Sequence, residues 1–468
     1  MASPPSPSSL SSFEKGDEIE PSFNETLPRK SWFHSVFFNI TIVGMCAFLS
    51  PGIWNSMSSL GAGGRQEPYL VNAANALVYG MMVVTCFFGS YITSKIGYRW
   101  SVVLGCVGYF PYATGLYENK MKGTEWLVLF GSFLCGTSAG LFWSVEGAIV
   151  MGYPEPSKRG RYLAFWLAFR NAGSILGGAI NLALNVKNAK GGSVSSSTYP
   201  VFIVLQAIAP FVGYLISNPS QVWRPDATPV RMEKRQTFRQ EMRDLLHLVK
   251  RKEILLLFPI ALYAQWCQAY AGTFATDVFS VRTRALGSFL LASTSVIANG
   301  VLGFFLDGKS LSKKFKARSS FLAIMSVLGG VWVWYTVLQL RYIHHPFKLD
   351  WTDGHRFGAA FALHLIFNCF YYLLQNELYW TISQVARGPT ELLQLSSLLR
   401  GLESAGAACG FGVSARKTLP RTIPLGINFA LWGISSIAAW FTVKDIGVKF
   451  GLDEKRIDTP QDTATVKH

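Results

Sequence analysis

Long apolar runs alternate with short polar connections along most of this chain. A helix needs about 20 mostly apolar residues to cross the roughly 30 Å hydrocarbon layer of a bilayer, and runs of this length recur throughout the sequence. The pattern predicts an all-α polytopic membrane protein with about twelve transmembrane helices. The expected spans are 34–56, 70–92, 100–118, 126–153, 161–184, 199–217, 253–275, 286–306, 319–340, 357–385, 391–414 and 422–443.

The longest polar interruption divides these spans into two groups of six, which predicts two pseudo-symmetric bundles joined by a linker. Between Glu233 and Glu253 the linker spaces apolar residues helically among Arg and Lys, which indicates a basic amphipathic helix on the inner membrane surface. A calmodulin-target helix is the alternative. The expected parts are a disordered cytosolic tail (1–33), an N-terminal bundle (34–217), a cytosolic linker (218–252), a C-terminal bundle (253–443) and a cytosolic tail (444–468).

Composition supports a membrane protein. The 468 residues are 50% hydrophobic and only 15% charged, with a mean hydropathy of +0.26, unlike a soluble enzyme. All seven cysteines fall inside expected spans, which argues against a disulfide framework or a metal site. Residues 1–30 have no apolar stretch of the signal-peptide kind.

The net charge of +16 does not require a nucleic-acid partner. With a cytosolic N-terminus, the inner loops and tails carry roughly 28 of the Lys and Arg residues and the outer loops roughly 13, as the positive-inside rule expects. Both termini are therefore predicted to be cytosolic, and the basic excess faces anionic lipid headgroups.

Ionisable residues inside the apolar runs form a pattern that occurs twice. Glu146 lies near the end of one span and Arg170 lies inside the next, and Glu377 and Arg400 repeat this arrangement in the second half. Glu403 follows Arg400 by three residues, on the same helix face. Because charges within a membrane are costly, these five residues are expected to form a substrate or proton pathway, with one cluster in each half. The alternative is a structural role, in which paired charges only lock neighbouring helices together.

Polar and aromatic side chains on several spans are candidates for lining a cavity between the halves. A wall of aromatic rings with a few amides suits an organic solute better than a bare ion, although Trp and Tyr also form interfacial belts. Pro51–Gly52 and Ala271–Gly272 are expected to break their helices, and Gly173, Gly177, Gly406 and Gly410 are expected to pack against neighbouring helices. The candidate lining residues are Asn39, Trp54, Asn55, Trp143, Gln265, Trp266, Gln268, Asn368, Tyr372 and Gln375.

Two sets of motifs carry a family resemblance. The segment from Gly89 to Arg99 resembles the loop signature of the major facilitator superfamily, with Thr93 where that signature has an Asp. The equivalent segment of the second half runs from Gly303 and keeps Asp307. The resemblance implies a twelve-helix transporter fold in which this signature packs the second helix on the eleventh and helps to close one face.

Further motifs resemble the fungal Unc-ninety-three-like branch of that superfamily. They are Pro51 to Met57, Leu60 to Gly64, and Phe279 to Leu286. This branch has no assigned substrate, and the resemblance implies that some animal relatives regulate or escort other membrane proteins.

The functional prediction is a secondary transporter of a small polar or organic solute that works by alternating access, with a proton as the candidate coupling ion. The alternative is a non-transporting regulator or trafficking partner of another membrane protein. No catalytic constellation, cofactor motif or phosphate-binding loop is present in the sequence, so an enzyme is not expected. His344, His345 and His355 lie in one outer loop without carboxylates or cysteines at ligand spacing, so no metal is expected there.

Overall fold

The computed structural model describes residues 31–60, 68–155, 158–187, 194–224, 230, 238–308, 310–387 and 389–451. Most of the two predicted tails and residues 225–229 and 231–237 of the linker lie outside these ranges. The helices of the first half are α1 (Val36–Ala47), η2 (Phe48–Gly52), α2 (Ile53–Ser59), α3 (Pro68–Ile96), α4 (Tyr98–Val107), α5 (Tyr109–Lys122), α6 (Trp126–Gly152), α7 (Arg159–Asn185) and α8 (Thr198–Gly213). The later helices are α9 (Phe238–Val249), α10 (Lys252–Leu255), α11 (Phe258–Val278), α12 (Val281–Asp307), α13 (Lys313–His344), α14 (Gly354–Val385), α15 (Pro389–Ser414) and α16 (Thr422–Val443).

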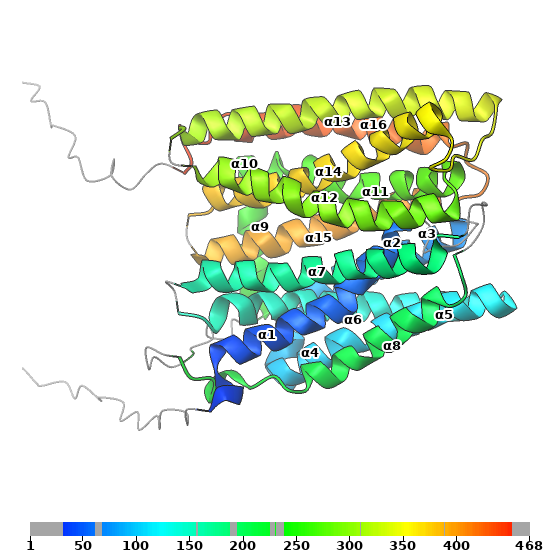
Figure 1. The fold of residues 1–468 in the computed structure, drawn as a ribbon. Helices are drawn as coiled ribbons and strands as arrows, with labels where there is room; N and C mark the ends of the chain where they lie inside the picture. Colours follow the sequence, from blue (N-terminus) through cyan, green and yellow to red (C-terminus); the bar gives the residue numbers. More distant parts are fainter. Residues whose placement is uncertain are drawn as a thin grey trace, which may run out of the picture.

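The long helices run side by side in one bundle (Figure 1). The start of α1 and the end of α16 lie at the same end of this bundle, which we call the terminus side, and the opposite end is the far side. Nine helical segments among the described residues are long and apolar enough to cross a membrane, and α8 is a shorter apolar helix. The α4–α5 pair, which meets at Gly108, and α15 lie in the same bundle. The chain is therefore a multi-pass helical membrane protein.

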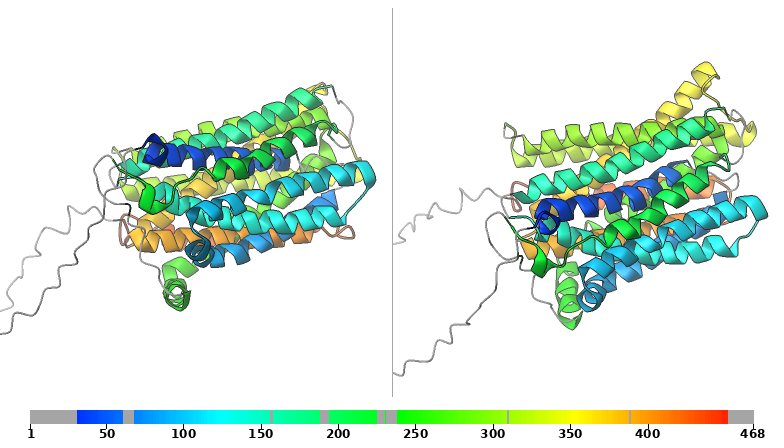
Figure 2. Two further views of the ribbon diagram at one scale, coloured as in Figure 1. Left: turned by 90° about the horizontal axis from the view of Figure 1, so that it is seen from below. Right: turned by 60° about the horizontal axis from the view of Figure 1, so that its bottom comes forward.

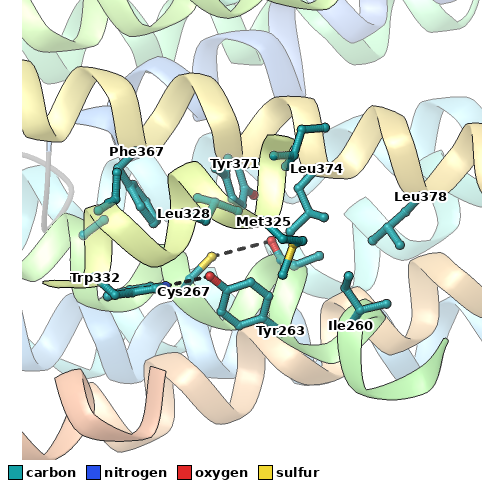
Figure 3. Close-up of a cluster of buried hydrophobic side chains, with 14 of the residues drawn as sticks. Ile260, Tyr263, Cys267, Met325, Leu328, Trp332, Phe367, Tyr371, Leu374 and Leu378 are labelled. Atoms are coloured by element: carbon teal, nitrogen blue, oxygen red, sulfur yellow. Dashed lines mark hydrogen bonds between the residues drawn. The ribbon is translucent and has the colours of Figure 1, made fainter. Parts of the chain in front are cut away.

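The buried cores divide the bundle into two halves. One apolar cluster consists entirely of residues from Leu248 onward, whereas the other two come from the first 222 residues, apart from Val281 and Ala285 at the start of α12. Figure 3 shows the centre of the cluster that begins at Leu248, the core of the second half. There the Trp332 indole N–H donates to the Tyr263 hydroxyl at 2.7 Å. Each half thus has its own interior, and the surface between the halves is the natural place for a site.

Glycines allow close contact between helices at the predicted positions. A Cβ atom on Gly173 would lie 2.5 Å from the Phe48 carbonyl oxygen, and one on Gly177 would lie 2.1 Å from the Ser56 hydroxyl oxygen. On α15 a Cβ atom on Gly406 would lie only 2.0 Å from the Leu262 carbonyl oxygen. Gly410 packs in the same way on α11. The packing role predicted for these four glycines is confirmed.

The replacement Gly406→Ala is therefore expected to destabilise the protein by about 1–3 kcal/mol, because the added methyl group forces α15 away from α11. Gly412→Ala on the same helix is the matched control, since a Cβ atom there meets nothing within 4 Å. It should be neutral or stabilise by up to about 1 kcal/mol, since alanine is the better helix former. Thermal unfolding midpoints in detergent compare the two variants, and equal midpoints would contradict the packing argument.

The first α-helical span is interrupted as predicted, but the seventh is not. Residues Phe48–Gly52 form a π-helical turn that contains Pro51, and such turns interrupt the regular hydrogen-bond ladder. Ser174 on α7 donates to the Gly52 carbonyl at 3.3 Å and so supports this turn. By contrast, α11 continues through Ala271 and Gly272 without a break. Glycine alone does not interrupt a helix whose other residues pack well, so that expectation was wrong.

The predicted linker helix is present as α9, which lies apart from the parallel helices and crosses their direction (Figure 2). Its residue Leu248 is buried, whereas Arg243 and His247 are exposed. Just beyond it, Arg251 contacts the carboxylates of both Glu253 and Glu391. The end of the linker is thereby fixed to the start of α15.

A polar cluster on the far side joins the turn between α11 and α12 to the connection before α14. Asp350 accepts hydrogen bonds from the Arg282 guanidinium, at 2.7 Å from Nε, and from the Ser280 hydroxyl at 2.6 Å. Ser280 also caps α12, since its hydroxyl accepts from the Thr283 N–H. Residues 279–286, whose motif carries part of the family resemblance, therefore fold this connection onto the far side. Arg282 holds the pKa of the Asp350 carboxyl well below its ordinary value, against the opposing effect of burial.

Asp350→Asn is expected to lower stability at neutral pH by about 1.5–3 kcal/mol, because hydrogen bonds to a charged acceptor are lost. Since the folded pKa of Asp350 is depressed, its contribution is present above the ordinary aspartate pKa of about 4 and is lost as pH falls further. The variant should therefore lose less stability than the natural chain between about pH 5 and pH 3. Thermal unfolding midpoints measured across that pH range test this prediction. Asp445→Asn is the control: it removes an ion pair with the exposed Lys449, and its midpoints should resemble those of the natural chain.

Candidate functional site at the interface of the two halves

Two arginines, one from each half, meet at a single tryptophan ring. The guanidinium carbons of Arg170 on α7 and Arg400 on α15 each lie 4.7 Å from the centre of the Trp143 ring on α6. Each arginine follows the first residue of its helix by the same 11 residues. At 1.5 Å per residue both lie roughly 16 Å from the terminus side. The two arginines therefore lie at the same level of the bundle, and the halves meet at this point.

Carboxylates complete this cluster. Glu403 lies 3.3 Å from the Arg400 guanidinium, and the Tyr379 hydroxyl on α14 donates to it at 3.4 Å. Glu146, one turn from Trp143 on α6, interacts electrostatically with both Arg170 and Arg400. One carboxylate oxygen of each glutamate is buried without a hydrogen-bond partner. We call Trp143, Glu146, Arg170, Arg400 and Glu403 the interface cluster.

Glu377 does not belong to the interface cluster, so the expectation of a separate Glu377–Arg400 pair was wrong. Its carboxylate instead accepts a hydrogen bond from the Ser320 hydroxyl on α13 at 2.9 Å, inside the second half. The physical reason is its direction around α14. Glu377 follows Tyr372 by five residues, which at about 100° per residue turns it roughly 140° away from the face that Tyr372 and Tyr379 share.

The polar residues of α11 and α14 form a chain of hydrogen bonds within the second half. The Gln375 amide donates to the Tyr371 hydroxyl at 2.9 Å, and that hydroxyl donates to Gln265 at 2.8 Å. A second contact joins the Gln268 amide to the Asn368 carbonyl oxygen at 3.5 Å. Tyr371, which joins the two glutamines, was not predicted from the sequence. It precedes Gln375 by four residues and therefore lies on the same face of α14.

The remaining candidate lining residues lie in different surroundings. Asn39 is fully buried near the terminus side, where its amide accepts the Ser217 N–H at 2.7 Å and ties α1 to the end of α8. It does not line the interface. Trp54 is buried against Tyr79 and has an indole N–H without a partner. Asn55 and Trp266 are partly exposed, and the Trp266 backbone is the surface on which Gly410 packs.

The two loop signatures have unequal surroundings. A Cβ atom on Gly89 would lie 2.3 Å from the Ser144 hydroxyl oxygen on α6, whereas one on Gly303 would meet nothing within 4 Å. Arg99 donates from Nε to the Ile216 carbonyl at 2.7 Å, so it binds the end of its own half. The hydroxyl of Thr93 is buried without a partner. Asp307 ends α12, and its side chain lies outside the described set.

Hydrogen bonds between the halves lie on the far side of Trp143 in the part of the chain that the structure describes. The Asn72 amide on α3 donates to the Thr273 hydroxyl at 3.1 Å and to the Ser414 carbonyl at 3.2 Å. The Asn181 amide on α7 donates to the Ser288 hydroxyl at 3.2 Å and also to the Ser56 carbonyl. Neither of these contacts across the interface was predicted from the sequence. Both asparagines lie one turn from the far ends of apolar spans, where polar residues are common.

Ring contacts continue the interface from the cluster toward the far side. The rings of Tyr79 on α3 and Phe411 on α15 are stacked with their centroids 5.7 Å apart. Phe411 follows Arg400 by 11 residues, which places both on one face of α15. Near the far end, the Lys417 ammonium lies 3.5 Å from the centre of the Tyr69 ring. The halves are thus joined from the interface cluster outward to the far side.

The described residues contain no group of three or more His, Cys, Asp or Glu side chains that could hold a metal ion. The interface cluster instead offers charges, hydrogen-bond donors and an aromatic face. These groups can bind a polar or ionic organic molecule and can take up a proton.

Sequence relatives identify the family. Residues 68–348 match the family described as "Ion channel regulatory protein UNC-93". A protein of Aspergillus versicolor, "Notoamide biosynthesis cluster protein O'", is 35% identical over 442 residues, which cover 94% of this chain and 96% of that relative. The chain belongs to the UNC-93 family. The motif resemblance from the sequence is thereby confirmed.

Solved structures show that this UNC-93 protein has the fold of major facilitator transporters. The crystal structure of a D-xylose–proton symporter superposes with a TM-score of 0.61 at 12% identity, covering 86% of this chain and 95% of that one. The nucleoside transporter NupG gives a TM-score of 0.57 at 11% identity, covering 87% of this chain and 98% of that one. At such low identity the likeness concerns the fold alone.

Proposed function

We propose that this UNC-93 protein is a secondary transporter of a small polar or organic solute, and that the solute binds at the interface cluster. The observation that carries the proposal is the meeting of Arg170 and Arg400, from opposite halves, on the one ring of Trp143. A solute bound there touches both halves, so its binding energy can depend on how the halves are arranged. That dependence is the requirement for alternating access.

The positions of the contacts between the halves support this mechanism. Hydrogen bonds from Asn72 and Asn181 hold the far side together, so the described conformation is the one closed at that side. With both termini on the cytosolic side, as the distribution of basic residues predicts, this is an inward-facing state. Rocking of the halves about the interface cluster would break these hydrogen bonds and expose the cluster to the other side.

The relatives support a small-molecule substrate. The Aspergillus protein is named for a biosynthesis cluster, and the two structural neighbours are transporters of a sugar and of nucleosides. The proton is the candidate coupling ion, because Glu146 and Glu403 each keep a buried oxygen without a hydrogen-bond partner.

The test is uptake by the purified full chain in proteoliposomes with a pH gradient. The vesicles are incubated with a defined mixture of sugars, nucleosides and organic acids, and their contents are identified by mass spectrometry. At least one solute should accumulate only when the protein is present, and Glu403→Gln should abolish this while Asp445→Asn does not. Absence of uptake, or unchanged uptake by folded Glu403→Gln, would refute the proposal.

A second candidate function follows from the family description, which names an ion channel regulator. A regulator would use its outer surface or loops to hold a membrane-protein partner, and the interface cluster would only fix the helices. Co-purification of a stoichiometric membrane partner, together with no uptake in the assay above, would favour this function. Uptake that needs Glu403 would exclude it as the sole activity.

A further inference from the structure

Among the described residues, Arg170 differs from Arg400, the other arginine of the interface cluster, in lacking an acceptor for its N–H groups. Its guanidinium lies over the Trp143 ring, and the residue as a whole is partly exposed. Among the described residues it has no hydrogen-bond acceptor and no carboxylate within salt-bridge distance. A guanidinium carries five donors in a planar fork, and an ionised group inside a membrane protein without partners is costly. An acceptor from outside the chain would relieve that cost.

The neighbours of Arg170 point to the same conclusion. Trp166, one turn earlier on the same face of α7, is 7% exposed and has a buried indole N–H without an acceptor. Arg400 at the same ring already has its carboxylate, Glu403. Two side chains whose donors have no acceptor among the described residues therefore lie one turn apart on α7. The Trp143 ring lies against Arg170, and Tyr372 interacts electrostatically with it.

We propose that Arg170 is the receptor for a carboxylate group of an organic anion, and that this anion binds together with one proton on Glu146. The proposal rests on the transport function proposed above and names its substrate class. The planar guanidinium fork matches a carboxylate in a two-point contact. The rings of Trp143 and Tyr372 provide apolar contact for an organic body, which inorganic anions do not use.

The charges of the cluster account for the proton. Two arginines and two glutamates balance when all four are ionised, so a bound anion adds one negative charge and one proton restores neutrality. Glu146 is 3% exposed and makes no hydrogen bond in the described chain, whereas Glu403 already has Arg400 and Tyr379 as partners. An anion at Arg170 therefore favours protonation of Glu146, and by reciprocity the proton favours the anion.

The other titratable groups around Glu146 do not compete with it for the linked proton. Cys46 on α1 and Tyr109 on α5 interact with it electrostatically, and Cys46 is adjacent to Cys106 on α4. Thiols and phenols are ordinarily neutral near pH 7. The charges that face Glu146 are those of Arg170 and Arg400, with Glu403 beyond them on α15.

The test uses three acid and amide pairs as probes: benzoate and benzamide, hexanoate and hexanamide, and indole-3-acetate and indole-3-acetamide. Thermal unfolding of the purified full chain in detergent reports binding, since a ligand of the folded state raises its stability. At least one acid should raise the midpoint while its amide does not. The shift should vanish in Arg170→Gln and persist in Arg341→Gln, whose side chain is exposed at the far end of α13. If Arg170→Gln does not fold, Arg170→Lys should bind the same acid at least tenfold more weakly.

Proton linkage is measured between about pH 6 and pH 8, where the probes stay ionised. In the natural chain the apparent Kd of the acid should increase with pH, by up to tenfold per unit for one linked proton. Glu146→Gln imitates the protonated carboxyl, so the affinity of this variant for the acid should not change with pH.

Each contrary result overturns a definite part of the proposal. Equal shifts with acid and amide, an unchanged shift in Arg170→Gln, or no shift with any acid would overturn the anion site. A Kd of the natural chain that is independent of pH would overturn the proton at Glu146. Uptake of a neutral solute without Arg170-dependent acid binding would refute this inference but not the transport function. Acid binding without uptake of any solute would refute transport and leave the anion site standing.

Discussion

Replacement of Arg400 by leucine is expected to reduce the free energy of unfolding by about 3–5 kcal/mol, because it leaves Glu403 as a buried charge without its partner. The Glu403 side chain is only 1% exposed and lies 3.3 Å from the guanidinium. Arg400 also faces the rings of Trp143 and Tyr379 and interacts with Glu146, so its loss weakens the contact between the halves. Thermal and denaturant unfolding of the purified protein measure the effect.

The double variant Arg400→Leu/Glu403→Leu distinguishes a lost ion pair from lost packing. If the cost arises from the uncompensated carboxylate, removal of Glu403 should recover most of the stability, because apolar replacements of buried ion pairs are often neutral. Arg341→Leu, at an exposed position, should change stability by about 0.5 kcal/mol or less. A double variant as unstable as Arg400→Leu alone would show that Glu403 is not the reason for the destabilisation.

The helices could be predicted from the sequence because a bilayer imposes a simple length and composition requirement. The span expected at 422–443 coincides with α16, and the one at 391–414 differs from α15 by two residues at its start. The helix at the end of the linker was also predicted correctly, because apolar residues recur there at helical spacing among basic ones, and α9 is present. These features depend on local periodicity, which the sequence displays directly.

The candidate site could be predicted only in part, because position along a helix determines depth but not direction. The repeated spacing of charged residues indicated equivalent positions for Arg170 and Arg400 along their helices, and both meet the Trp143 ring. The same spacing also suggested Glu377 as a partner for Arg400, but Glu377 accepts a hydrogen bond from Ser320 in the interior of the second half. The true neighbours of Arg400 include Trp143, which is 257 positions away in the other half. Contacts of that kind follow from how the halves dock, and no local pattern reports them.

The two asparagines that close the far side illustrate a further limit. A lone Asn near the end of an apolar run is compatible with lipid headgroups, water or another helix, so the sequence does not single it out. In the structure Asn72 and Asn181 each bond to the opposite half, and Gly178 lies one turn before Asn181. A Cβ atom on Gly178 would lie 2.6 Å from the Phe289 Cα atom and 2.8 Å from the Ser288 carbonyl oxygen. At this point the backbones of α7 and α12 touch.

Gly178→Val is therefore expected to open the far side. The added side chain cannot fit against the α12 backbone, which does not yield as a flexible side chain would, and the Asn181 hydrogen bond to Ser288 must break with it. If the clash raises the free energy of the far-closed state by about 3 kcal/mol relative to the far-open state, the ratio of the two states changes by more than a hundredfold. The variant should thus populate the far-open state almost completely, while the fold within each half stays intact because Gly178 faces the other half.

Distances between spin labels at the far side measure this change. Labels at positions 121 and 343, which are exposed near the far ends of α5 and α13, report on the two halves separately in a chain whose exposed Cys409 has been replaced. In Gly178→Val the distance between these labels should lengthen. Gly300→Val on α12 is the matched control, since a Cβ atom there meets nothing within 4 Å, and its distance should equal that of the natural chain. An unchanged distance in folded Gly178→Val would mean that the contact between α7 and α12 does not hold the far side closed.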